Sequence, residues 1–493
     1  TAFRAARWIA TDASRPRDDD VEYTLTINSV SPRRKPRENN PSVLYRVPTG
    51  FLRKRSMAMN SIHAEATELL LSAIFRTPAD NSYSHSFFYG PPGTVPFFGN
   101  AVARIFYRRD HLMRAVMYVR SHGSPHLRYV SIETVRTTLQ NFIKENFWHI
   151  NHGVVFSDPN QSYAELISKE KKEALSQTLH QSEIFSPQSF VTLFPLVTVR
   201  VDVDFASEIF FLSHPDTLSS HLTDAELSHG IAASSFPPLQ DWDGISHSPA
   251  SWLGVRAPSS ESASKMRRTL LGCLALATSS DYRHLFSGRP TFGGFCELNT
   301  SYRLSVGESH TPALMEDIVI AANDAGWLDS LASKMVSNDD NSQRQLRSME
   351  YFYRAWPLSD SERFPLLCMA LDSILGKRED STQAVIDGVH LTLGKKVNSS
   401  RVRKLLKLRA SVIHGGAPDV YDSKKYGSYY NTYSDDPISD MELLVVACIR
   451  ASSFGNLFRE QPDPQLEFRA RLEREGRITP RGEVRSILDD IED

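Results

Sequence analysis

The sequence predicts an α+β fold, in which a mixed α/β N-terminal region precedes an all-α helical bundle. In the first part, "VTVRVDVDF" at 197–205 alternates apolar and polar residues, which is the pattern of a half-buried strand. The run "PTFGGFCELNTSYRLSV" at 290–306 is typical of a hairpin. From residue 310 onward strand patterns disappear, and apolar residues recur at helical spacing. Strands in one part and helices in the other indicate segregated elements.

Helical spacing also occurs between the strand patterns of the first part. It predicts helices at 58–76, 131–148, 162–179 and 263–278. The run "AVMYV" within 101–130 is strand-like, Thr223 and Glu226 fit a capping box, and the Pro- and Ser-rich segment 236–262 predicts a long surface loop. In the second part, helices are predicted at 313–323, 326–336, 342–356, 362–375, 381–393, 398–413 and 438–458.

These patterns divide the chain of 493 residues into four stretches. We expect residues 1–150 to form an α+β N-terminal region and 151–336 to form an α+β middle region of unknown fold, with sensing of a trigger or recruitment of a substrate as its expected role. The acidic, Asn-rich "SNDDNSQ" marks the start of a helical domain at 337–460. A charged C-terminal tail, 461–493, follows.

Composition narrows the class of protein. The formal net charge is -2, so any affinity for a polyanion must come from a local patch. The four cysteines are scattered with no CxxC pair, and no apolar run is long enough for a membrane span. We expect a cytoplasmic protein with no membrane partner, no metal and no cofactor. "GPPGT" at 90–94 lacks the Gly-Lys-Ser/Thr of a phosphate-binding loop.

One predicted helix, 398–413, carries an arginine on its apolar side. On a helical projection Val402, Leu405, Leu406, Val412 and Ile413 all lie within about 60° of Arg409. A buried guanidinium without a partner costs several kcal/mol, so Arg409 requires one. The opposite side carries Arg401, Lys404, Lys407 and Ser411, which we expect to face water.

Two further helices bring a charge to the interior. Arg450 lies among the apolar residues of 438–458, and Asp372 lies in "RFPLLCMALDSIL", which is apolar nearly all round. One interpretation is a structural ion pair of Asp372 with Arg409 or Arg450.

The residues after Arg409 favour a catalytic role for this arginine over a purely structural one. Gly415 and Gly416 should end the helix through a left-handed cap and leave His414 in its last turn. A guanidinium can hold phosphate oxygens through two parallel hydrogen bonds, and a histidine can exchange a proton near neutral pH. This pair would suit phosphodiester cleavage.

The string "LLKLRASVIHGG" resembles the Arg-x(4–6)-His signature of HEPN domains, and it is most like the Apea-like HEPN group. "FPLLCMALDSILG" is similar to the family's apolar helix that ends in Ala-Leu-acidic, here with Asp372. "LLVVACIRAS" resembles its last helix, with Arg450. The resemblance covers roughly 340–460. One position departs from it, because many active members have a polar residue where this chain has Ala410.

The resemblance implies a metal-independent RNA endonuclease that acts as a homodimer through the HEPN domain. The RNA 2′-hydroxyl would attack the adjacent phosphorus and leave a cyclic phosphate. His414 would serve as general acid or base and Arg409 would stabilise charge on the phosphate, with Asp372, Arg450 and Ser411 in support. Such domains often act as toxins or phage-defence effectors.

Local charge agrees with an RNA partner. From Gly388 to Pro418 there is no Asp or Glu. The expected RNA-binding residues are Lys395, Lys396, Arg401, Arg403, Lys404 and Lys407. In "YDSKKYGSYYNTY" at 421–433 the tyrosines could stack on unpaired bases, but the run is better explained as a loop between helices.

Two alternatives stay open. Ala410 could mark a non-catalytic HEPN module that binds RNA or a protein partner. Alternatively, a regulatory protein or phage trigger could control the nuclease by binding to residues 1–310.

Overall fold

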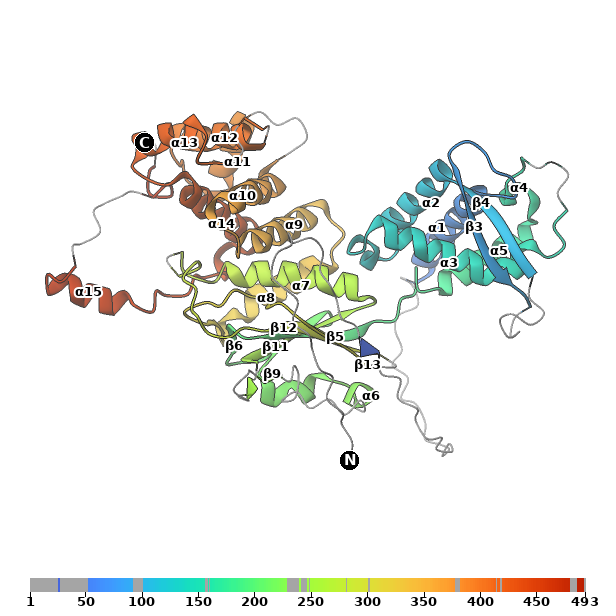
Figure 1. The fold of residues 1–493 in the computed structure, drawn as a ribbon, viewed down its shortest axis with the longest axis horizontal. Helices are drawn as coiled ribbons and strands as arrows, with labels where there is room; N and C mark the ends of the chain where they lie inside the picture. Colours follow the sequence, from blue (N-terminus) through green and yellow to red (C-terminus); the bar gives the residue numbers. More distant parts are fainter. Residues whose placement is uncertain are drawn as a thin grey trace, which may run out of the picture.

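The computed structural model describes residues 52–91, 101–155, 160–227, 249–280, 282–299, 302–376, 382–413, 415–416, 419–478 and 486–491, and the short stretches 25–26, 158, 239–240 and 246–247. Figure 1 shows an N-terminal unit of helices and a small sheet, a larger central sheet with helix α7 above it, and a stack of helices from α9 to α14. The chain therefore has an α+β fold.

The N-terminal unit, defined as residues 52–186, packs helices around a small antiparallel sheet. Its helices are α1 (Leu52–Ser72), α2 (Arg109–His122), η1 (Pro125–Arg128), α3 (Ile132–Asn151), α4 (Tyr163–Leu166) and α5 (Lys169–Gln181). Its strands β2 (Ile74–Phe75), β3 (Ser82–Tyr89) and β4 (Ala101–Arg108) pair in the order β2-β4-β3. The Ser131 hydroxyl accepts a bond from the backbone N–H of Thr134 at 3.0 Å and so caps α3, the helix predicted at 131–148.

The central sheet has seven antiparallel strands in the order β1-β13-β12-β5-β11-β8-β7. They are β1 (Leu25–Thr26), β5 (Phe190–Leu196), β7 (Phe205–Ala206), β8 (Phe210–Ser213), β11 (Ser251–Ala257), β12 (Gly293–Leu298) and β13 (Tyr302–Gly307). Two small ladders join β6 (Val199–Val201) to β14 (Ile318–Ile320) in parallel and β9 (Leu239–Gln240) to β10 (Ser246–His247). The short helices η2 (Pro215–His221) and α6 (Asp224–Leu227) follow β8.

This sheet is buried on both faces. Alternate residues of β5 and β11 point to opposite sides, so Phe194 and Leu253 join the core that includes α7 (Ser260–Ala275). On the other side, Leu193 and Trp252 pack with Leu218 of η2.

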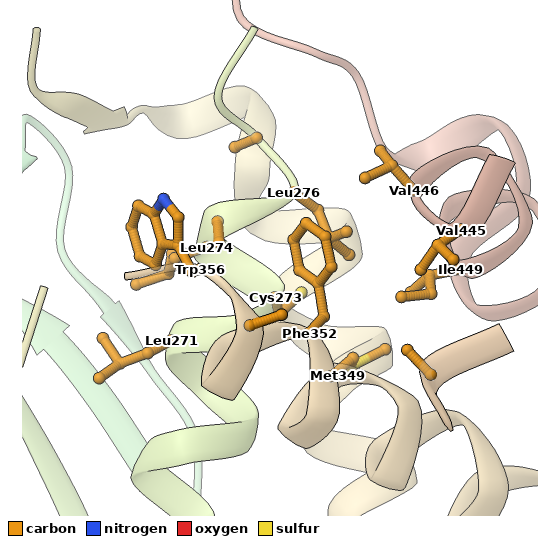
Figure 2. Close-up of a cluster of buried hydrophobic side chains, with 14 of the residues drawn as sticks. Leu271, Cys273, Leu274, Leu276, Met349, Phe352, Trp356, Val445, Val446 and Ile449 are labelled. Atoms are coloured by element: carbon orange, nitrogen blue, oxygen red, sulfur yellow. The ribbon is translucent and has the colours of Figure 1, made fainter. Parts of the chain in front are cut away.

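The remaining helices stack on α7. They are η4 (Ala322–Asp324), α8 (Ala325–Val336), α9 (Asp340–Ala355), α10 (Asp360–Leu375), α11 (Thr382–Leu393), α12 (Ser399–Ile413), α13 (Lys424–Tyr433), α14 (Pro437–Phe454), η5 (Gly455–Leu457) and α15 (Leu466–Arg474). Figure 2 shows side chains of α7, α9 and α14 meeting in one apolar cluster, among them Cys273, Phe352 and Ile449. A Cβ at Gly272 would stand 2.0 Å from the Met349 carbonyl oxygen, so this approach of α7 to α9 requires glycine.

Several predicted elements are confirmed within a few residues. The hairpin at 290–306 is β12 and β13, and the capping box is present, with Thr223 N–H bonded to Glu226 at 2.7 Å. Helices α3, α7, α8, α9, α10, α11, α12 and α14 match their predicted ranges, whereas α1 begins six residues before its predicted range 58–76, whose last residues include β2. The predicted helix 162–179 is interrupted where α4 ends and Ser168 caps α5.

Other predictions are wrong. "AVMYV" lies in α2, where Ala115, Val116 and Val119 are buried at helical spacing. The supposed loop 236–262 contains β11, a central strand, and the start of α7, while most of 236–248 lies outside the described residues. The predicted helix 313–323 contains β14, and the run at 424–433 is helix α13 and not a loop.

Apolar packing crosses the expected domain boundaries. One buried cluster of the N-terminal unit includes Leu139 and Leu179, on either side of residue 150. Another joins the central sheet to α8 and α9 across residue 336. In the predicted tail, α15 projects from the rest (Figure 1), whereas Ile487 is fully buried and Ile491 bridges to Val397. Among the described residues, no helix combines the length and apolar character of a membrane span.

Candidate functional site at the end of helix α12

Helix α12 ends in the manner that its glycines predict. Gly415 has a φ of +72°, which is the left-handed conformation. Its N–H donates to the Val412 carbonyl at 3.1 Å, and the Gly416 N–H donates to the Ser411 carbonyl at 2.8 Å. These two bonds are those of a Schellman motif. His414, the predicted general acid or base, lies outside the described residues.

Arg409 pairs with Asp372 of α10. Its Nη1 donates to Asp372 Oδ1, and the two side chains are 25% and 41% exposed. Of the neighbours expected beside Arg409, Val402, Leu405 and Leu406 are buried, but Ile413 is 45% exposed. The guanidinium is therefore at the rim of the core, where it has a partner and is also accessible to solvent.

Burial raises the pKa of Asp372 above its ordinary value, and Arg409 offsets part of that rise. The Asp372 carboxylate is therefore protonated more readily than that of an aspartate in water. A phosphate that approached Arg409 would compete with this carboxylate for the same guanidinium.

Arg450 does not join this pair. Its Nε donates to the Leu276 carbonyl at the end of α7 at 3.1 Å, and its Nη1 donates to Glu460 at 2.7 Å. Of the two ion pairs considered for Asp372, the structure contains the one with Arg409. Arg450 instead caps α7, and a direct supporting role beside Arg409 is not borne out by its position.

Ser411, the other expected supporting residue, faces α13 and its preceding turn. Its hydroxyl accepts a bond from the Ser423 hydroxyl at 3.2 Å. Its carbonyl receives the Gly416 N–H, so Ser411 helps to fix the end of α12.

Arg401 contradicts the expectation of a solvent-facing, RNA-binding residue. Its side chain is only 2% exposed. Its Nη2 lies 2.5 Å from Asp440 and 3.0 Å from Asp435, and its Nη1 lies 3.6 Å from Asp490. Tyr429 accepts a further bond from its Nε at 3.2 Å. These partners satisfy the guanidinium, so we remove Arg401 from the candidate RNA contacts.

The other basic residues divide into two groups. Lys396 and Lys407 are exposed. Lys395 is half-buried and donates to the Leu488 carbonyl, Arg403 donates to Gln383 at 2.7 Å, and Lys404 donates to Thr432 at 2.7 Å.

The basic side of α12 and Arg409 point in different directions. On the helical projection Arg403, Lys404 and Lys407 lie roughly 120–160° from Arg409. A nucleic acid that contacted both would have to pass around an end of the helix.

The tyrosine-rich helix α13 is partly structural. Tyr429 is fully buried and donates to Asp440, and Tyr426 donates to Asp436 at 3.1 Å. Tyr421, just before the helix, and Tyr430 are 47% and 52% exposed, so the side chains of these two are accessible to solvent.

Sequence reasoning missed an exposed apolar surface beside the Arg409–Asp372 pair. Met369 of α10 is 42% exposed, and it lies one turn before Asp372, as Ile413 lies one turn after Arg409. Their exposure could not be read from helical spacing, because both belong to apolar patterns that resemble core faces.

No group of three potential metal ligands occurs among the described residues. Comparisons with family models, with curated proteins and with solved structures returned no match for this chain.

Proposed function

We propose that this chain is a metal-independent RNA endonuclease of the HEPN type, with Arg409 and His414 as its catalytic residues. The observation that supports it best is the solvent-accessible guanidinium of Arg409, bonded to Asp372 one turn before the glycine-ended terminus of α12. The helical bundle around this pair would be the HEPN domain.

In this reaction the RNA 2′-oxygen attacks the adjacent phosphorus while the bond to the 5′-oxygen breaks. The products are a 2′,3′-cyclic phosphate and a 5′-hydroxyl. His414 takes the proton of the 2′-hydroxyl or supplies one to the leaving oxygen. Arg409 binds the non-bridging oxygens, whose charge grows in the transition state. Asp372 orients the Arg409 guanidinium, and the phosphate displaces the Asp372 carboxylate from it when RNA binds.

A second copy of the chain would complete the site. The exposed Met369 and Ile413 flank the Arg409–Asp372 pair, and apolar side chains at such a rim favour association of two like surfaces. In the homodimer two Arg/His sets would line one cleft, and Lys396, Arg403, Lys404 and Lys407 would bind RNA as it passes around α12.

Regulation would come from the remainder of the chain. The resemblance favours a toxin or phage-defence effector, and residues 1–310 would respond to a regulatory protein or a phage trigger.

The experiment that tests the function is incubation of the full chain with RNA in the presence of EDTA. We expect products that end in cyclic phosphate, and their loss in Arg409→Ala and His414→Ala.

The matched control is Arg474→Ala, an exposed arginine of α15, which projects away from α10 and α12 (Figure 1). It should cleave as the wild type does. Cleavage that persists in both active-site variants, or that stops when EDTA is added, would contradict the proposal.

A non-catalytic HEPN module that binds RNA or a protein partner is the second candidate. Two observations favour it: one Nη group of Arg409 already donates to Asp372, and the residue after Arg409 in the sequence is the apolar Ala410. In that case RNA would bind without being cut, the affinity would fall with salt, and His414→Ala would bind as tightly as the wild type.

A further inference from the structure

The small sheet of the N-terminal unit has one covered face and one open face. On the inner face Phe87 packs on Phe147 of α3 with ring centroids 5.0 Å apart, and Gln140 donates to the Tyr83 hydroxyl at 2.7 Å. The opposite face is formed by residues that pair across β3 and β4, namely Ser82–Arg108, Ser84–Phe106, Ser86–Arg104 and Phe88–Val102. We call these eight residues the outer face.

The outer face carries positive charge without acidic residues. Arg104 is exposed, and its Nη2 bonds only weakly to Ser84, at 3.5 Å. Neither Arg104, Arg108 nor the following Arg109 forms an ion pair with a carboxylate of the described residues. By contrast, Arg114 of α2 lies 3.6 Å from Asp110. A surface of arginines without carboxylates complements a polyanion.

The arginines lie on aromatic rings. The guanidinium carbon of Arg104 is 5.4 Å from the Phe106 ring centroid, and that of Arg108 is 3.7 Å from the Phe75 ring centroid. A planar guanidinium that rests on a ring has its second face available for another flat group. Since Arg104 is exposed, a nucleobase could stack on its guanidinium.

A cavity of about 390 Å³ adjoins this end of the hairpin. It is lined by Tyr83, Arg109, Leu112, Met113 and Arg136. Tyr83 belongs to the inner face, and Arg109 directly follows Arg108 of the outer face, so the cavity lies at the margin between the two faces. The cavity can receive a phosphate or a base at the margin of the sheet.

We propose that the outer face binds single-stranded nucleic acid. Arg104, Arg108 and Arg109 contact the phosphates, and unpaired bases stack on the Arg104 guanidinium. A duplex hides the flat faces of its bases, so it fits this surface less well. The inference rests on the N-terminal unit alone and holds whether or not Arg409 and His414 cleave RNA.

The test is fluorescence anisotropy of a labelled oligouridylate of about 12 nucleotides, within the range that single-strand modules cover. The full chain is used in the His414→Ala background, so that any cleavage does not consume the probe. We expect Arg104→Glu to raise the Kd at least about tenfold, and Arg104→Lys to raise it about threefold or more, because lysine keeps the charge but loses the planar stack.

Arg114→Glu is the matched control, since it makes the same change of charge on α2, whose buried residues pack with those of the inner face. Its Kd should change less than about twofold. Melting temperatures of all variants verify folding. Equal losses in Arg104→Glu and Arg114→Glu, unchanged binding by Arg104→Lys, or equal affinity for a duplex of the same length would each overturn the proposal. Arg104-dependent binding to anionic vesicles without binding to the oligonucleotide would overturn it as well.

Discussion

Arg401 keeps a positive charge in a place that solvent scarcely reaches. Asp440, which is fully buried, accepts bonds from its guanidinium and from the Tyr429 hydroxyl, and its other oxygen accepts the Ile487 N–H at 3.2 Å. One charged group thus connects α12, α13, α14 and the C-terminal segment. Its value to stability depends on every partner being present, because a buried charge without its counterion is costly.

Arg401→Ala should therefore destabilise the chain severely. The variant leaves Asp440 buried without its cation, for which we expect a loss of about 3–5 kcal/mol in the free energy of unfolding. Lys407→Ala, on the exposed side of the same helix, should change it by less than about 0.5 kcal/mol. Urea unfolding monitored by circular dichroism measures both. Similar midpoints for the two variants would show that the Arg401 cluster contributes little.

Helical spacing identified Arg409 as an arginine with a partner, but it assigned Arg401 to water. The projection is reliable for contacts along one helix, and Val402 and Leu405 are buried as predicted. Arg401 is covered by Asp435 and Asp490, which come from distant parts of the chain. No pattern within α12 contains that information. The same limit applies to Arg450, whose partner Leu276 directly follows α7.

At the scale of elements, the end of α12 depends on backbone conformation. Gly415 is in the left-handed region, and among the described residues no other group lies within 4 Å of the point where a β-carbon would stand. A side chain there would therefore meet backbone strain and not a clash. Gly427, in the middle of α13, has equally open surroundings but lies in a regular helix.

The two glycines should respond to alanine with opposite signs. Gly415→Ala should destabilise by about 1 kcal/mol, because alanine resists a positive φ. Gly427→Ala should stabilise by about 0.5–1 kcal/mol, because alanine favours the helix and restricts the unfolded chain. Thermal melting of both variants gives the two signs. A stabilising Gly415→Ala would contradict the left-handed turn.

Elements differed in how well the sequence foretold them. Bundle helices such as α9 and α12, and the β12–β13 hairpin, show one apolar side, so their periodicity is visible. Strand β11 is buried on both faces, and "SWLGVRA" therefore lacks alternation. Helix α13 is rich in Gly, Ser and Tyr, and its helical state depends on packing of Tyr429 against α14. In both cases tertiary contacts decide the conformation.

At the scale of the molecule, Glu442 of α14 connects the helices to the segment after α7. It lies 2.6 Å from Arg283 Nη1 and 2.9 Å from His284 Nε2. Burial alone would raise the pKa of Glu442, but His284 and Arg283 lower it to about 2. In the N-terminal unit, His63 of α1 faces His180 of α5 at 3.2 Å, and burial lowers the pKa of His63 to about 4.

The pKa shifts of His63 and Glu442 predict that the free energy of unfolding falls with acid in two separate pH ranges, an upper window and a lower window. The pKa of His63 rises from about 4 in the folded chain to 6.5 when unfolded, so its contribution is complete above 6.5 and is lost as pH falls toward 4. The pKa of Glu442 rises from about 2 to 4.5, so its contribution is complete above 4.5 and is lost as pH falls toward 2. Each group can steepen the loss by at most about 1.4 kcal/mol per pH unit.

Melting temperature measured against pH can separate the two windows. His63→Gln removes the titrating ring, so its curve should be flatter than that of the wild type in the upper window and parallel to it in the lower one. Glu442→Gln should show the reverse, beginning from a lower melting temperature because Arg283 loses its buried counterion. Some upper-window slope should remain in His63→Gln, since burial also lowers the pKa of His310 in the central part. If either variant keeps the wild-type slope throughout its own window, that residue does not link protonation to folding.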